Sequence, residues 1–189
     1  MKGQMIHRAT EHTFEGRTLE GIAYRFEHPS RVVDPGKPAY MEAFARGSAT
    51  KSIREKGRFP VDYYHGLMSG TPGARSRWSG EVFGSVMFAN GSDGLEFTAT
   101  ISRTRGGDEM LELLGDGALG DVSIAAYPVK TSTRSGVVWR DEIALAALSL
   151  APVGTGQHDG AKVLAMRADG DTAPLLADLR RRRALLITP

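Results

Sequence analysis

Residues 115–129 read GDGALGDVSIAAYPV, a glycine-rich turn that leads directly into an apolar segment with one serine near its start. Val122, Ile124 and Tyr127 are residue types that favour β-strands. Ser123 therefore begins a strand immediately after a turn. Such a serine is either an ordinary strand hydroxyl or a nucleophile presented at a strand edge, and the rest of the chain must decide between them.

Composition places the chain among soluble globular proteins. It has 189 residues, of which 41% are hydrophobic and 24% charged, so we expect one domain over residues 1–168 and a basic C-terminal tail over 169–189. The net charge of +2 does not indicate a surface made for nucleic acid. We expect no membrane partner either, because no window approaches the 18 apolar residues of a span and the N-terminus lacks the apolar stretch of a signal peptide. The absence of cysteine excludes disulfides, thiolate metal sites and a cysteine nucleophile, and it fits a reducing cytoplasm.

Most of the chain reads as short strands. Each predicted strand is rich in β-branched or aromatic residues and is bounded by Gly, Pro, Asp or Ser. The residues 90–94, NGSDG, have the composition of a hairpin turn. The predicted strands are residues 17–27, 58–64, 80–89, 95–102, 122–129, 136–140, 142–152 and 161–167.

Two segments predict helices instead. Residues 40–57 are rich in helix formers with a glycine interruption, and residues 106–120 place Met110, Leu113 and Leu114 on one helical face after an aspartate that could cap it. Many strands with two helices predict a β-rich α+β fold, a closed or nearly closed β-barrel surrounded by a few helices. The run Arg180–Arg183 is interpreted as a solvated helix face or a flexible basic tail, ahead of a nucleic-acid patch.

The histidines predict no metal centre, and no cofactor is expected. None of His7, His12, His28, His65 and His158 has the spacing of a helical zinc motif. His65 differs from the others because it ends the strand-like run FPVDYYH and precedes a loop. That position suits a general base that faces a cleft, although a structural role is the alternative reading.

Known hydrolase and nucleotide motifs are missing around Ser123. The chain has no G-x-S-x-G elbow, no S-x-x-K around this serine, and no phosphate-binding glycine loop. An α/β-hydrolase and nucleotide chemistry are therefore disfavoured. Ser102 and Ser149 read as strand hydroxyls.

The order of several short motifs is more informative than any one of them. These motifs are Gly21-Ile22-Ala23, Glu42-Ala43-Phe44, Tyr64-His65, Asp93-Gly94-Leu95, Glu112-Leu113-Leu114, the turn from Gly117 to Ile124, Ser149-Leu150, and Ala161-Lys162-Val163. Their order over residues 20–167 resembles the prohead maturation protease family of tailed phages, which are relatives of the herpesvirus capsid-assembly proteases.

The resemblance implies a herpesvirus-protease-like barrel and a serine endopeptidase. It assigns Ser123 as nucleophile and His65 as general base, because a serine hydroxyl becomes a good nucleophile when an imidazole accepts its proton. It further implies a scaffold protein, or the scaffolding segment of the major capsid protein, as substrate, with self-cleavage as a second reaction. Such an enzyme works in the host cytoplasm inside the assembling procapsid, and its relatives often form homodimers.

Two positions depart from the family pattern. Ala125 stands where the family often has glycine, and Ala147 stands where the third catalytic member is expected. Glu142 and His158 are the candidates for the missing third catalytic member, and Asp141 and Glu109 are further acids near in sequence. Glu142 is a poor direct replacement, since a regular strand directs residues 142 and 147 to opposite faces.

Two further readings follow from the resemblance. Arg134, in the loop after the serine strand, is a candidate oxyanion-hole residue, because an arginine often serves in the herpesvirus relatives; a solvated loop charge is the alternative. For the whole protein, the alternative to a protease is a non-catalytic scaffold-binding assembly protein with a degenerate protease fold, which Ala147 favours. A β-barrel binding module unrelated to phage assembly is the remaining reading.

Overall fold

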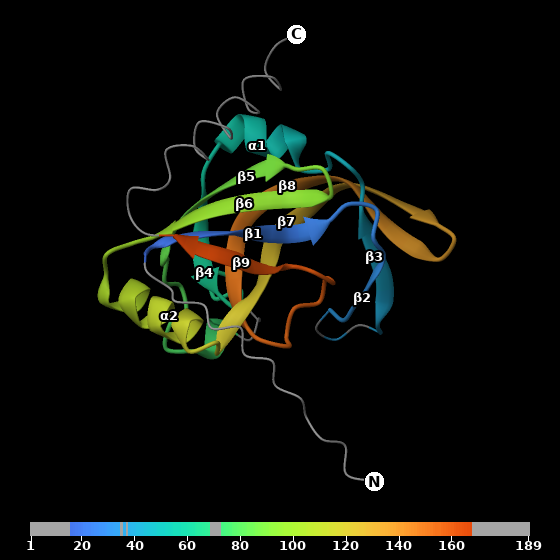
Figure 1. Cartoon of the computed structure of the whole chain (residues 1–189). Coiled ribbons are helices and arrows are strands. Elements are labelled where there is room, and N and C mark those ends of the chain that lie inside the picture. The colour runs from blue at the N-terminus through green and yellow to red at the C-terminus, as the bar shows by residue number, and fades with distance from the viewer. Residues whose placement is uncertain (1–15, 35, 37, 69–72, 168–189) are drawn as a thin grey trace.

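Seven strands close into a β-barrel, as predicted (Figure 1). The computed structural model describes residues 16–34, 36, 38–68 and 73–167. The barrel runs β8-β4-β5-β6-β1-β9-β7 and back to β8, and two further strands extend it in the order β2-β3-β8. The strands are β1 (Thr18–Arg25), β2 (Ser30–Val32), β3 (Tyr40–Phe44), β4 (Phe59–Tyr63), β5 (Gly84–Asn90), β6 (Gly94–Ile101), β7 (Leu119–Arg134), β8 (Val137–Pro152) and β9 (Lys162–Arg167).

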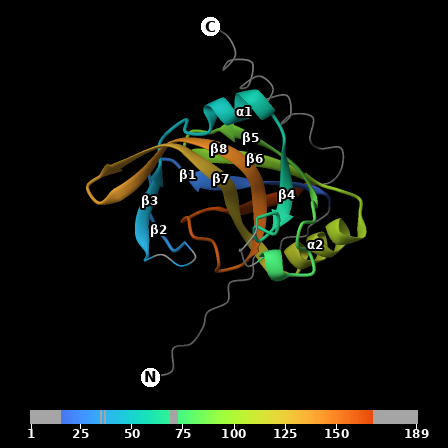
Figure 2. The same cartoon turned by 180° about the vertical axis from the view of Figure 1, so that it is seen from behind.

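The long strand β8 connects the parts of the molecule. It pairs antiparallel with β7 along its whole length, in parallel with β3 at its N-terminal end and in parallel with β4 toward its C-terminal end. Parallel neighbours need a long crossover connection, and here the chain between β4 and β8 supplies β5, β6, α2 and β7. The hairpin of β7 and β8 extends beyond the barrel on the side of β3 (Figures 1 and 2).

Side chains alternate across the strands that carry the site. Val61 of β4, Leu148 and Leu150 of β8 and Val122 of β7 belong to the buried core. Because successive residues of a strand point to opposite faces, residues 62, 149 and 123 point to the outer face of the barrel. The apolar core therefore determines which side chains are available for the site.

The helical predictions need correction. The predicted helix over residues 40–57 is wrong at its start, because Tyr40–Phe44 form β3 and the helix α1 spans only Thr50–Lys56. Met, Glu and Ala favour a helix locally, but parallel pairing with β8 overrides that propensity. The helix α2 spans Arg105–Gly115, and its cap is Thr104, whose side chain accepts from the amide of Gly107. The predicted aspartate cap is thus wrong, and residues 119–120 start β7.

The strand predictions are largely confirmed. The segments 136–140 and 142–152 form one continuous strand, and the short strand β2 was not predicted. The turn 90–94 links β5 and β6 as expected.

The predicted tail 169–189, with Arg180–Arg183, lies outside the described residues. None of the described helices is long and apolar enough to cross a membrane.

A buried ionic cluster holds β3 against β8 and the segment before β9. Glu42, 6% exposed, accepts from the Arg140 guanidinium at 2.6 Å and lies 3.2 Å from His158 Nε2. Tyr40 also donates to Glu42 and accepts from Arg140. Burial alone would raise the pKa of Glu42, but the contacts with His158 and Arg140 outweigh it and lower that pKa below its ordinary value of 4.5.

We predict that Glu42→Gln destabilises the protein at neutral pH by about 1.5–3 kcal/mol, because charge-assisted hydrogen bonds to Arg140 and His158 are lost. A lowered pKa in the folded state stabilises the protein above the carboxyl's ordinary pKa, and this contribution is lost as the pH falls through the lowered value. The difference from wild type should therefore shrink on acidification. Urea unfolding at a series of pH values measures it, with the exposed Glu112→Gln as control. A difference that stays constant with pH would contradict this account.

Candidate active site

Three polar side chains form a row across β4, β8 and β7. Asp62 is the register partner of Ser149, and Ser149 is the register partner of Ser123. Register partners in neighbouring strands place their side chains on the same face, with Cβ atoms roughly 5 Å apart. The row therefore lies on the outer face of the barrel, opposite the core residues described above.

His65 is brought onto this row by a tight turn after β4. The amide of Tyr64 still donates to the carbonyl of Leu150, and the backbone then turns through two left-handed residues, Tyr64 with φ 46° and His65 with φ 62°. Non-glycine residues rarely adopt this conformation, and it occurs more often at functional sites. The turn places His65 Nδ1 3.0 Å from Ser149 Oγ. Consequently His65 contacts Ser149, the residue that is the register partner of Ser123.

The turn is tied back to the strand that precedes it. The amide of Leu67 donates to Asp62 Oδ2 at 3.0 Å, and the amide of Gly73 donates to the carbonyl of Tyr64 at 2.9 Å. Gly73 sits so close that an added Cβ would lie 2.3 Å from the carbonyl oxygen of Tyr63. These backbone contacts tie the turn that carries His65 to β4 and to the short 3-10 helix Gly73–Arg75.

Burial favours the neutral form of the His65 imidazole. Loss of solvation lowers the pKa of His65 below its ordinary value of 6.5, while the negative charge of Asp62 acts in the opposite direction. A neutral imidazole at physiological pH is able to accept a proton, as a general base must.

The two serines of the row differ in access. Ser149 is 0% exposed and is covered by His65, whereas Ser123 is half-buried and has no side-chain hydrogen bond within the described part of the chain. Ser123 is therefore the hydroxyl that a substrate can reach.

Two residues of the site were not predicted from the sequence. Ser149 was interpreted as an ordinary strand hydroxyl, and Asp62 was not identified as a candidate, although an aspartate inside the apolar run FPVDYY is a signal of a functional position.

The candidate third members lie elsewhere or lack the needed group. Ala147 is buried opposite Ala125 and contributes no polar atom. Glu142 is seven residues from Ser149 along β8, roughly 23 Å, and pairs with Lys51. His158 contacts Glu42 and packs against Phe44.

The remaining acids and Arg134 are also engaged away from the row. Glu109 pairs with Arg77 and Arg105, and Asp141 pairs with Arg134 at 2.6 Å. Arg134 stacks on Trp139 at the tip of the hairpin, eleven residues from Ser123 and so roughly 35 Å along β7. The structure thus does not bring Arg134 next to Ser123.

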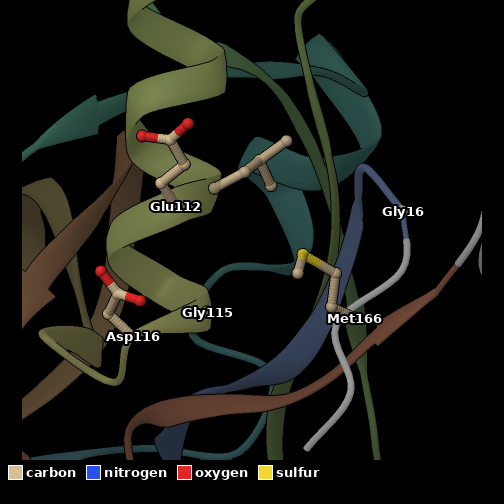
Figure 3. A pocket seen from close by; sticks show the side chains of 6 residues that line it. Gly16, Glu112, Gly115, Asp116 and Met166 are labelled. Atoms are coloured by element: carbon tan, nitrogen blue, oxygen red, sulfur yellow. The ribbon is translucent and has the colours of Figure 1, made fainter.

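A separate cavity of about 530 Å³ lies between α2 and the ends of β1 and β9. Figure 3 shows Glu112 of α2 and Asp116, the residue just after α2, on one side and Met166 of β9 on the other. Neither His65 nor Ser123 lines it. Within residues 16–34, 36, 38–68 and 73–167, no group of three His, Asp or Glu side chains has the arrangement of a metal site.

Comparison with known proteins adds no family assignment: no protein-family model matches the chain, and no curated protein does. The interpretation of the site therefore depends on its residues and geometry.

We predict that Gly73→Ala destabilises the protein by about 1–3 kcal/mol, because its Cβ would press on the carbonyls of Tyr63 and Tyr64 and push the His65 turn away from β8. Thermal unfolding measures the effect. Gly115→Ala is the matched control: nothing lies within 4 Å of its added Cβ, and in helix α2 the change should stabilise by up to about 1 kcal/mol. Equal stability of the Gly73→Ala variant and wild type would contradict the close packing of this turn.

Proposed function

We propose that this protein is a serine endopeptidase of the capsid-maturation type, with Ser123 as nucleophile and His65 as general base. The observation that carries the proposal is the row on the barrel's outer face, where the His65 imidazole contacts Ser149 directly opposite Ser123. The two proposed catalytic residues are far apart in sequence, and each adjoins Ser149 of β8, His65 through a hydrogen bond and Ser123 as its register partner in β7.

The chemistry proposed for the site is acyl transfer. His65 Nε2 accepts the proton of Ser123 Oγ as the oxygen attacks the carbonyl carbon of the scissile peptide bond. The imidazolium then gives that proton to the departing amine, which leaves an acyl-serine, and water activated by the same imidazole hydrolyses it. The hydrogen bond between Ser123 and His65 forms as substrate binds, since such contacts often tighten only in the substrate complex.

The shape of β7 supports an extended peptide as substrate. Among the described residues, β7 pairs with β9 only at Asp121 and Lys162, so beyond that pair its second edge has no described strand beside it. A peptide laid along this edge would gain main-chain hydrogen bonds next to Ser123. Tyr127 and Val129, 61% and 56% exposed on β7, offer apolar contacts to its side chains. A scaffold protein or the scaffolding segment of the major capsid protein is the substrate class that we propose, with the assembling procapsid in the host cytoplasm as the place of action.

One observation favours a second function. Ala147 provides no carboxylate at the position where the family pattern has its third member. A protein that kept the barrel and lost efficient catalysis would act as a scaffold-binding assembly protein, and it would use the same β7 edge to bind without cleaving.

We predict that a fluorophosphonate probe labels wild-type protein at Ser123. An activated serine oxygen attacks the phosphorus of the probe and displaces fluoride, in the same way that it attacks the carbonyl carbon of a peptide bond and displaces the amine. Ser123→Ala should abolish labelling, and His65→Ala should slow it by at least about 100-fold. Ser102→Ala, which changes an exposed serine at the end of β6, is the control and should label like wild type. Mass spectrometry of the intact protein and its peptides measures the rate and the site.

The same intact-mass time course at high protein concentration detects self-cleavage. Discrete truncation in wild type, absent from the Ser123→Ala and His65→Ala variants, would establish the protease and reveal its cleavage sites. Specific binding of a scaffold segment without labelling or turnover would instead establish the assembly protein.

A further inference from the structure

We propose that Ser149 and Asp62 together position the His65 imidazole and so replace the carboxylate that residue 147 lacks. The inference deepens the proposed function and rests on it. Both are positioning residues: they act on His65 and do not touch the substrate.

Ser149 supplies the contact to the imidazole. For His65 Nε2 to accept the proton of Ser123, the neutral ring must carry its hydrogen on Nδ1. That Nδ1–H then donates to Ser149 Oγ at 3.0 Å. Ser149 is completely buried in the middle of β8, so its oxygen has a fixed position and selects both the ring orientation and the tautomer, as an orienting carboxylate does in a triad.

Asp62 supplies the charge. Its side chain is 0% exposed, Oδ2 accepts from the Leu67 amide, and Oδ1 is buried with no hydrogen-bond partner among the described residues. Asp62 and Ser149 are register partners, so the carboxylate lies on the same face of the barrel as Ser149, and its charge acts on the imidazole through space. The four residues of the proposed site are then Ser123, His65, Ser149 and Asp62.

The energetics explain why an acid is present in this strand. Burying a carboxylate with one unpaired oxygen is costly, and an asparagine would serve equally well as acceptor for the Leu67 amide. A negative charge is useful only if a positive charge forms nearby during the reaction. The imidazolium of His65 is that charge, and Asp62 already opposes the effect of burial on the pKa of His65. Tyr63 and Tyr64 are the titratable neighbours of Asp62 and His65 in this turn.

The test compares three variants with two controls. Ser149→Ala removes the contact, Ser149→Thr keeps the hydroxyl on a residue suited to a strand, and Asp62→Asn keeps the shape and the acceptor for Leu67 without the charge. Ser52→Ala is the control for Ser149, because Ser52 is also a buried serine bonded to β8, at the Leu145 amide. Asp141→Asn is the control for Asp62, because it removes a charge at the distant hairpin.

Two quantities are measured: the fluorophosphonate reaction rate over a range of pH, and the pKa of His65 by NMR titration of its ring in a Ser123→Ala background. We expect Ser149→Ala to react at least about tenfold more slowly and Ser149→Thr to recover most of that loss. Asp62→Asn should react more slowly at its plateau. It should also lower the pKa of His65 and move the rising limb of the pH profile to lower pH, since the imidazolium loses a neighbouring negative charge.

The outcomes separate this proposal from the proposed function. Labelling that survives in both Ser123→Ala and His65→Ala would overturn the protease itself. Labelling that needs Ser123 and His65, but is within twofold of wild type in Ser149→Ala and Asp62→Asn, would overturn only the positioning role. The NMR titration needs no activity: an unchanged His65 pKa in Asp62→Asn, in a variant whose thermal unfolding shows that it is folded, also overturns it.

Discussion

Pairing of β8 with β4 on one side and β7 on the other is the interaction on which the site depends. β8 pairs with β4 in parallel and with β7 antiparallel, and together these contacts close the barrel. The buried residues Leu148 and Leu150 fix the inward face of β8, so Ser149 between them must point outward. A slip of one residue would reverse every side chain of the strand. The hydrophobic core thereby sets the register of Asp62, Ser149 and Ser123.

The position of the His65 side chain depends on the turn after β4 and not on strand pairing. Two consecutive left-handed residues and the close approach of Gly73 direct the His65 ring back onto its own sheet. The buried carboxylate of Asp62 anchors that turn through the Leu67 amide and also acts electrostatically on the ring. Backbone strain, a buried charge and a buried hydroxyl are all costly for stability. All three features occur within a few residues of His65. A catalytic role for His65 accounts for them together, and this supports the proposed protease over a binding module.

Sequence reasoning predicted the barrel and most strands, because alternating β-branched and aromatic residues bounded by turn residues are a local signal. It failed at Tyr40–Phe44, where helix-forming residues join a strand through pairing with β8, a partner nearly 100 residues away. The candidate pair Ser123 and His65 came from motif order, and the structure brings both residues next to Ser149. Glu142 and His158 were candidates for the third catalytic member, and Arg134 was a candidate for the oxyanion hole. Each of them instead forms an ion pair away from Ser123 and His65.

The sequence by itself determined the strand-rich composition of this chain, the absence of cysteine chemistry and the local turn signals, because these depend on residue type and short spacing. It could not determine which polar side chains share one face of the barrel. That depends on the register of three strands and on a left-handed turn, which result from packing of residues far apart in the chain. Only the tertiary structure therefore placed the unremarked Asp62 and Ser149 beside His65 and Ser123.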